Sequence, residues 1–306
     1  GRIFVLILKV NTAMKLNKFY FNRILVVTLI TLLLAGCSST DDSTDSEPVL
    51  ERTKITMEPT GNVDVDWETA TMVWNEEFNE TTVLDDIWVF ESKNTTNPDV
   101  ADQLQVYRKE NVSLSGGTMK ITAKKKAAVY TSARINSKYA FKYGRIEISA
   151  KLPEQEKNGI WAKLVLIGDN EATVGWPQCG EIDIMEYFSH KANEFNNNIH
   201  SAANNAFDGS LISANHNLET VEEEFHAYGI LWTDRYIKFY VDDPGNILYT
   251  FNRPSSPNDN NWPFDKPFYL LVDMVVGGKY IGDNGVDDTL FPAVMEIDYI
   301  RVYHIQ

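Results

Sequence analysis

The chain has 306 residues, of which 12% are aromatic, and a formal net charge of -15 at pH 7. This acidity argues against nucleic acid or another anionic polymer as a partner, because like charges repel. The length suits one large domain or two small ones, and the aromatic content is compatible with stacking on uncharged sugar rings.

The N-terminal part has the pattern of an export signal. We take Met14 as the start and interpret residues 1–13 as an upstream extension. In residues 14–36 a basic stretch precedes the apolar run Ile24–Leu34, which is too short to span a bilayer. The signal ends in Leu-Leu-Ala-Gly-Cys37, which resembles the lipobox of bacterial lipoproteins. The resemblance implies an exported protein, lipidated on Cys37 and held at the outer membrane or surface of a Gram-negative bacterium. A plain cleaved signal with an incidental cysteine is the alternative.

Residues 37–67 are predicted to be the lipidated cysteine and a flexible acidic tether. The run Ser38–Glu47 is polar, acidic and low in complexity, so it cannot bury enough apolar surface to fold. Cys37 and Cys179 are the two cysteines of the chain. If Cys37 carries lipid, Cys179 has no disulfide partner and is expected to pack as a small hydrophobic residue.

Residues 68–306 are predicted to form a single all-β domain. Short runs of alternating polarity are separated by Gly, Asn and Asp turn signals, and no long stretch has the 3.6-residue period of a helix. Many short strands of this kind indicate a β-sandwich or barrel. The predicted strands are Ala70–Trp74, Thr118–Ala123, Gly144–Ala150, Ile160–Ile167, Glu181–Tyr187, Ala227–Thr233, Ile237–Val241, Phe268–Val275 and Glu296–Tyr303.

One predicted strand carries three acids, Glu181, Asp183 and Glu186, interleaved with apolar residues. Side chains at 181 and 183 share a face, whereas 186 has the wrong parity for a regular strand. An extra residue in a β-bulge, at Ile184 or Met185, would return Glu186 to the acidic face. Such bulges are frequent beside active sites.

This row of acids points to glycosidic bond cleavage. A fold gains nothing from aligned carboxylates on a half-buried strand, because repulsion and desolvation both cost stability. A retaining glycosidase needs them: one carboxylate attacks the sugar carbon, and a carboxylic acid about 5–5.5 Å away protonates the leaving oxygen. A solvated acidic edge strand without chemistry is the alternative reading of the row taken alone.

A series of motifs in the right order resembles glycoside hydrolase family 16 over nearly the whole predicted domain. One such block would be a weak signal, whereas so many in order are a strong one. The blocks are Trp74–Asn79, Leu84–Asp85 with Trp88, Tyr130–Ile135, Phe141–Glu147, Gly159–Trp161, Trp176–Glu186, Phe225–Tyr228, Trp262–Asp265, Gly277–Gly278 and Asp298–Tyr303.

The resemblance implies a β-jelly roll, in which two curved antiparallel sheets form a sandwich with a substrate cleft on the concave face. It also implies cleavage with retention of configuration, with Glu181 as nucleophile, Glu186 as general acid/base and Asp183 between them. An ionised Asp183 disfavours a second charge on Glu186, so Glu186 is expected to hold a proton near neutral pH while Glu181 stays ionised. No cofactor is expected for catalysis.

The motifs also bear on the substrate. The bulged acid motif is similar to that of members acting on β-1,3-glucan and on algal galactans, and the blocks at Trp176, Trp262–Asp265 and Val276–Gly278 look like laminarinases. We therefore predict a monomeric endo-β-1,3-glucanase that acts on neutral β-glucan. Sulfated galactans would require Arg and Lys clusters, which this acidic chain lacks. The alternatives are a hydrolase of mixed-linkage β-1,3-1,4-glucan or an algal galactan, and a non-catalytic glycan-binding lipoprotein.

Four residues outside the acid row match family positions at the sugar. Trp161 and Trp176 would stack on glucose rings. Arg134 would hold hydroxyls of minus-side sugars, and His200 would bond a plus-side sugar or orient Glu186. The alternatives are core packing for the tryptophans, an ion pair for Arg134 and a purely structural role for His200.

The resemblance further implies one structural calcium on the convex face, held by Glu77, Gly117 and Asp298, mostly through backbone oxygens. Two departures from the family pattern concern the cleft. Where the family reads Trp-Pro-Ala-(Leu/Phe)-Trp, this chain has Trp161-Ala-Lys-Leu-Val165, so the second tryptophan is missing. Asp273 stands where laminarinases often have Asn. Both changes bear on which β-glycan is preferred and leave the acid row intact.

Overall fold

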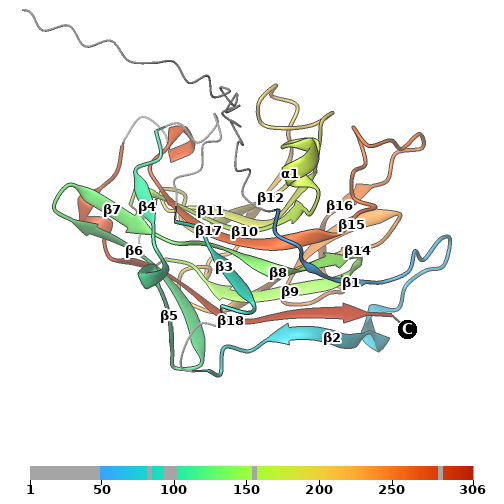
Figure 1. The fold of residues 1–306 in the computed structure, drawn as a ribbon, viewed down its shortest axis with the longest axis horizontal. Coiled ribbons are helices and arrows are strands. Elements are labelled where there is room, and N and C mark those ends of the chain that lie inside the picture. The colour runs from blue at the N-terminus through green and yellow to red at the C-terminus, as the bar shows by residue number, and fades with distance from the viewer. Residues whose placement is uncertain (1–48, 81–84, 93–101, 154–156, 282–284, 306) are drawn as a thin grey trace, which may run out of the picture. The chain divides into compact units, whose positions relative to one another are not determined.

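The computed structural model describes residues 49–305 except 81–84, 93–101, 154–156 and 282–284 (Figure 1). The predicted extension, signal peptide and lipidated Cys37 therefore lie outside the described residues. Within the described part, no helix is long and apolar enough to cross a membrane.

The domain is built almost entirely from β-strands, which form two sheets. The first sheet has the order β1 (Thr53–Thr56), β8 (Arg134–Lys142), β17 (Phe268–Val276), β10 (Ile160–Gly168), β11 (Glu181–Phe188), β12 (Glu194–His200), β13 (Ile212–Asn217), and β3 (Trp88–Phe90) also pairs with β8. The second has the order β16 (Ile247–Asn252), β15 (Tyr236–Val241), β14 (His226–Trp232), β9 (Gly144–Lys151), β18 (Ala293–His304), β6 (Thr118–Lys126), β7 (Val129–Ser132), β4 (Gln105–Tyr107). In addition, β2 (Thr71–Glu76) pairs with β18 and β5 (Val112–Ser115) pairs with β6.

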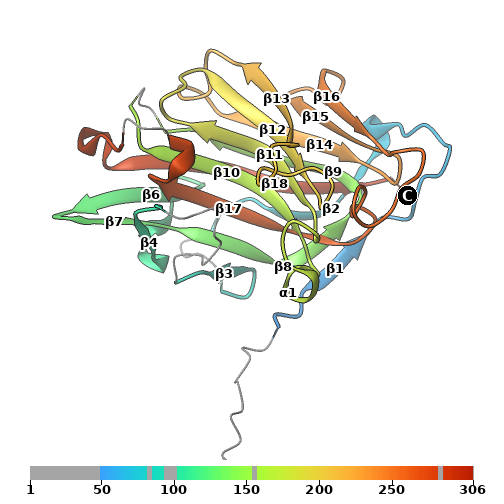
Figure 2. The same ribbon diagram turned by 90° about the horizontal axis from the view of Figure 1, so that it is seen from above.

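The two sheets lie face to face, with β9 and β18 in one layer and β10 and β17 in the other (Figures 1 and 2). One apolar core joins them: it contains Leu164 and Ile182 from the first sheet and Ile148 and Ile230 from the second. The helical segments are short: α1 (Glu171–Val174), η1 (Trp67–Thr69), η3 (Lys109–Asn111), η4 (Lys279–Ile281) and η5 (Asp288–Leu290). The all-β sandwich predicted from the sequence is confirmed.

All nine predicted strands are present, within a few residues of their predicted ends. The strands that the sequence analysis missed include β8 and β12, which carry the predicted site residues Arg134 and His200. Each combines a core face with a polar outer face; β12 reads Glu-Phe-Asn-Asn-Asn-Ile-His. A polar residue on the core face interrupts the alternation by which the other strands were recognised: Asn197 between Phe195 and Ile199 in β12, and Ser137 between Ile135 and Tyr139 in β8.

The predicted tether is shorter than expected, because the segment before residue 68 joins the domain. The compact unit begins at Pro48, and β1 runs parallel to β8 with Ile55 opposite Phe141. The side chain of Arg52 donates to the carbonyl of Ser137 at 2.9 Å and pairs with Asp169 at 3.0 Å. The predicted domain start at residue 68 was therefore wrong. The segment belongs to the domain because the β-branched residues of β1 cover an edge of β8 that would otherwise be free to pair with another strand.

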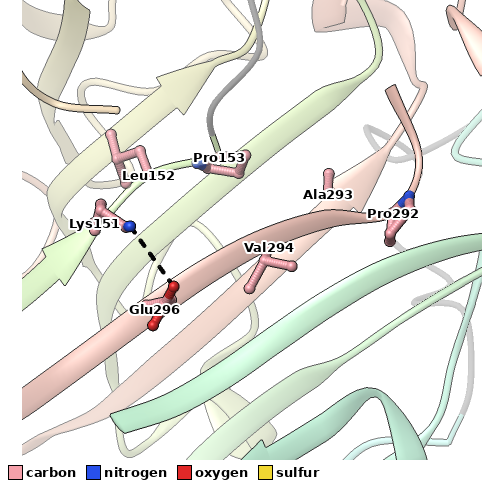
Figure 3. Close-up of a pocket in the computed structure, with 7 residues that line it drawn as sticks. All are labelled: Lys151, Leu152, Pro153, Pro292, Ala293, Val294 and Glu296. Atoms are coloured by element: carbon pink, nitrogen blue, oxygen red, sulfur yellow. Dashed lines mark ion pairs between the residues drawn. The ribbon is translucent and has the colours of Figure 1, made fainter. Parts of the chain in front are cut away.

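A hollow of about 240 Å³ lies where β9 ends and β18 begins (Figure 3). Lys151 and Glu296 lie side by side on its wall, 3.7 Å apart, and Lys120 also reaches Glu296, at 3.1 Å. None of the three predicted catalytic acids lines this hollow. It belongs to the second sheet, whereas the acid row is on β11 in the first.

Candidate active site

The predicted bulge is present on β11. The register against β10 shifts between Leu164 and Val165, which leaves Ile184 without an opposite residue. The side-chain amide of Asn197, on β12, donates to the carbonyl of Ile184 at 2.6 Å. This bond satisfies a backbone oxygen that the bulge removes from the regular ladder. As a result Glu186 stands on the same face as the other two acids.

Glu181 and Asp183 each have a partner on this face. The indole N–H of Trp176 donates to Glu181. Nε2 of His200 lies 3.1 Å from a carboxylate oxygen of Asp183. Asp183 is fully buried, whereas 8% of the surface of Glu181 is exposed.

Glu186 is held from two neighbouring strands. The indole N–H of Trp161, on β10, donates to one of its oxygens at 3.1 Å, and the amide of Asn198, on β12, donates to the other. Glu186 is 7% exposed. The two donors fix the orientation of the carboxyl group on the outer face of the sheet.

The acids have different proton affinities because their surroundings differ. Burial and the negative charge of Asp183 raise the pKa of Glu186 to about 7, against the opposing charges of Lys163 and His200. Burial and the charge of Glu181 raise the pKa of Asp183 to about 6, although His200 opposes this shift. Glu186 therefore holds a proton near neutral pH in a large fraction of molecules, as the sequence analysis expected.

His200 is the cation of the row. Burial lowers its pKa, but the charges of Asp183 and Glu181 outweigh burial and raise it to about 9. The ligand atoms of Glu181, Asp183 and His200 lie within 4.8 Å of one another, a grouping that would also suit a metal ion. We interpret it as a hydrogen-bonded catalytic row, since Trp176 and His200 already donate to the two carboxylates.

The two tryptophans predicted to stack on sugars differ in the structure. One face of the Trp161 ring stacks on Phe188 at 5.6 Å and 15°, and the Lys163 ammonium lies 4.0 Å from its centroid. With 8% of its surface exposed, Trp161 supports Glu186 and offers little ring to a sugar. Trp176 is more open and packs against Phe207, whose side chain is 48% exposed. Phe207 lies in a loop that no motif marked.

Arg134 lies on the same sheet but is engaged in ion pairs. Its guanidinium pairs with Glu91 at 3.0 Å and with Asp273 at 2.8 Å, and its side chain is 16% exposed. The strands β17 and β10 separate it from the acid row on β11. The ion-pair alternative thus describes its contacts.

Of the predicted calcium residues, Asp298 lies in β18, Glu77 directly follows β2 and Gly117 lies in the turn before β6. β9 pairs along one edge of β18, and β6 and β2 pair with successive parts of the other edge, with Ile297 opposite Met119 and Ile300 opposite Glu76. Glu77 and Gly117 therefore flank the segment that contains Asp298. The carboxylate of Glu77 accepts two hydrogen bonds from Arg301, each at 2.8 Å, so Glu77 would offer a cation its main-chain oxygen. The expected ligation, mostly through backbone oxygens, stays a prediction.

Comparison with known proteins identifies the family. The model described as "Glycosyl hydrolases family 16" matches residues 100–301. The chain belongs to glycosyl hydrolase family 16. Family 16 membership makes the protein a glycoside hydrolase with a jelly-roll fold, for which catalysis needs no cofactor.

Relatives in family 16 resemble this chain over most of its length. The β-glucanase of Rhodothermus marinus is 33% identical over 78% of this chain and 85% of that protein. Glucan endo-1,3-beta-glucosidase A1 of Niallia circulans is 31% identical over 77% of this chain but only 38% of that longer protein. The crystal structure of a laminarinase from Flavobacterium sp. UMI-01 has a TM-score of 0.71 and 39% identity, and the match covers 76% of this chain and all of that one.

The Asp183–His200 pair makes a testable contribution to stability. Replacing His200 by Asn leaves Asp183 buried without its cation, which should lower the free energy of unfolding by about 2–3 kcal/mol at pH 6. Because the folded pKa of His200 is raised from 6.5 to about 9, its contribution is complete below pH 6.5 and is lost as the pH rises through 9. Urea denaturation of both proteins at pH 6, 7.5 and 9 should show the difference shrinking.

The control is His216→Asn on β13, where burial lowers the pKa of the imidazole. Its difference from the parent protein should stay flat between pH 6.5 and 9. A His200→Asn difference that is equally flat would show that the imidazole does not hold a proton for Asp183.

Proposed function

We propose that this protein is a retaining endo-β-1,3-glucanase that acts as a monomer on laminarin-type β-glucan. The observation that carries the proposal is the bulge on β11, which gathers Glu181, Asp183 and Glu186 on one face. The substrate class is supported by the printed names of the relatives, a β-glucanase, an endo-1,3-β-glucosidase and a laminarinase. Light scattering of the soluble domain would test the monomer.

The arrangement supports a two-step reaction. In the first step a carboxylate oxygen of Glu181 attacks the anomeric carbon, and the bond to the leaving oxygen breaks as Glu186 gives that oxygen its proton. The product is a glycosyl-enzyme ester and a shortened glucan. In the second step Glu186, now ionised, takes a proton from water while the water oxygen attacks the same carbon. The ester bond breaks, Glu181 is released and the configuration is retained.

Asp183 assists by electrostatics. Its charge makes a second negative charge on Glu186 less favourable, which keeps the acid protonated until the leaving oxygen needs the proton. Trp176 donates to Glu181 and so fixes the attacking carboxylate. In both cases the protein holds the reacting groups in place before the substrate arrives, which lowers the entropic cost of the reaction.

Other β-glycans are the second candidate. Val165 replaces the second tryptophan of the family pattern, and its aliphatic side chain, which is fully buried, has no ring on which a sugar could stack. Mixed-linkage β-1,3-1,4-glucan and a galactan are therefore the alternative substrates, to be compared with laminarin on one panel of polysaccharides. A non-catalytic glycan-binding protein is disfavoured by the row itself, because binding alone does not need a protonated carboxyl group beside a nucleophile.

Glu181→Ala should lower kcat/KM on laminarin by at least about 10⁴-fold, since it removes the attacking group. Laminarin binding by calorimetry should change little, because the aromatic and hydrogen-bonding residues remain. Glu223→Ala, an exposed turn residue, is the matched control and should keep full activity. Proton NMR of the first product should show the β-anomer in the parent enzyme.

Full activity of Glu181→Ala would exclude Glu181 as nucleophile. A parent enzyme that releases no reducing ends from laminarin, curdlan or lichenan would exclude the glucanase. A first product in the α-configuration would exclude retention.

We also propose that the protein is exported and anchored through a lipid on Cys37, as the lipobox-like run predicts. In a Gram-negative host grown with labelled palmitate, the full chain should appear in the membrane fraction with label. Cys37→Ser should lose the label and move to the soluble fraction, whereas Cys179→Ala, in the folded domain, should keep the label. An unlabelled parent protein, or a labelled Cys37→Ser protein, would contradict lipidation at this residue.

The calcium site is a third proposal, with the carboxylate of Asp298 and main-chain oxygens of Glu77 and Gly117 as ligands. Saturating calcium at about 100 times its Kd would add about 2.7 kcal/mol of stability. A chelator should then lower Tm by about 5–10 °C for a domain of this size. Asp298→Asn should abolish the response to chelator and Asp208→Asn, an exposed loop control, should retain it. An equal Tm of the parent protein with chelator and with excess calcium would rule out the site.

A further inference from the structure

Four charged side chains lie in register across the first sheet. Asp273 of β17 is opposite Arg134 of β8 on one side and opposite Lys163 of β10 on the other. Lys163 in turn is opposite Glu186 of β11. We name Arg134, Asp273, Lys163 and Glu186 the charge row. Directly opposed residues in antiparallel strands have Cβ atoms about 4.5–5.5 Å apart, so each member acts on the next.

Two members of the charge row are departures from the family pattern. Lys163 stands at the position of Ala in the Trp-Pro-Ala-(Leu/Phe)-Trp motif, and Asp273 stands where laminarinases often have Asn. The structure makes these two departures cross-strand partners. An added base and an added acid therefore offset each other in a nearly buried place, where either charge alone would be costly.

The surroundings of Lys163 direct its charge toward Glu186. The residue is 8% exposed, and its ammonium lies 4.0 Å from the centroid of the Trp161 ring. Cation–π contact with an indole compensates part of the lost hydration. The same indole donates its N–H to Glu186 at 3.1 Å, so Lys163 touches the group that orients the predicted acid/base.

On the side away from Glu186, Lys163 faces Asp273, which does not neutralise its charge completely. One oxygen of Asp273 pairs with Arg134 at 2.8 Å, and Arg134 also pairs with Glu91. The second oxygen of Asp273 is buried and has no hydrogen-bond partner among the described residues. Asp273 is thus committed first to Arg134, and the charge of Lys163 still favours the ionised form of Glu186.

We propose that Lys163 is a positioning residue that sets the acid strength of Glu186 and, through Trp161, its orientation. This inference rests on the proposed role of Glu186 as general acid. Burial and Asp183 make Glu186 a weaker acid; Lys163 opposes them and keeps its proton transferable near neutral pH. The charged groups that face Glu186 are Lys163 from β10, His200 from β12, Asp183 and Glu181 from β11, and, farther along the row, Asp273 and Arg134.

The test is the pH profile of kcat/KM on laminarin, whose alkaline limb reports the loss of the proton from the acid. Removing a neighbouring cation raises the pKa of a carboxyl group, so Lys163→Met should move this limb up by about 0.5–1 pH unit. Lys163→Arg keeps the charge and should restore the limb of the parent enzyme. Lys238→Met is the matched control, because Lys238 also lies over an aromatic ring, that of Tyr236, but on the second sheet; its limb should not move.

Asp273→Asn provides the opposite perturbation. It returns the residue common in laminarinases, keeps the shape of the side chain and removes the negative charge beside Lys163, so the limb should move down by a smaller amount. If Lys163→Met does not fold, the Asp273→Asn limb decides: a downward shift supports the inference, and an unchanged or raised limb overturns it.

The possible failures are distinguishable. A Lys163→Met enzyme that is active with an unmoved or lowered limb overturns the role of Lys163 alone, while the proposed glucanase stands. Inactivity of the parent enzyme on every β-glucan tested removes the proposed function itself.

Discussion

The single hydrogen bond between the amide of Asn197 and the carbonyl of Ile184 stabilises the feature on which the site depends. Two residues separate Asp183 from Glu186, and in a regular strand that spacing would send Glu186 into the core. The bulge returns it to the outer face and leaves one backbone carbonyl outside the ladder. The side-chain amide of Asn197 donates a hydrogen bond to this carbonyl. The position of the acids on β11 therefore depends on a side chain of the neighbouring strand β12.

The rest of the site provides partners for carboxyl groups that are buried close together. Three carboxyl groups lie close together with little solvent, an arrangement that would be unstable without partners. His200 supplies a cation to Asp183, and Lys163 supplies another to Glu186 from the opposite strand. Indole N–H groups hold the two outer acids. The result is that Glu186, beside the buried Asp183, retains a proton near neutral pH, as a general acid must.

The sequence predicted what local pattern encodes. The parity of the three acids required a bulge at Ile184 or Met185, and the structure has it at Ile184. Strands with a clear polar and apolar alternation were found, whereas the asparagine-rich β12 was missed because its polar side chains serve the site. The partners of Trp161 could not be read from the sequence either, because Phe188 reaches it only through strand pairing. The same holds for Arg52, whose bonds to Ser137 and Asp169 span distant parts of the chain.

The bulge also bears on how such enzymes can diverge. Opposite β10, Met185 and Asp183 face the consecutive residues Leu164 and Val165. A strand lacking Ile184 would thus read Glu-x-Asp-x-Glu, close the ladder and keep every acid on its present side, while the flanking pairs stayed where they are. The long and short versions of the motif then differ by a single codon. In the short version Asn197 would have no unpaired carbonyl at position 184 to bond, so proteins with the short motif are expected to carry a different residue at the position of Asn197.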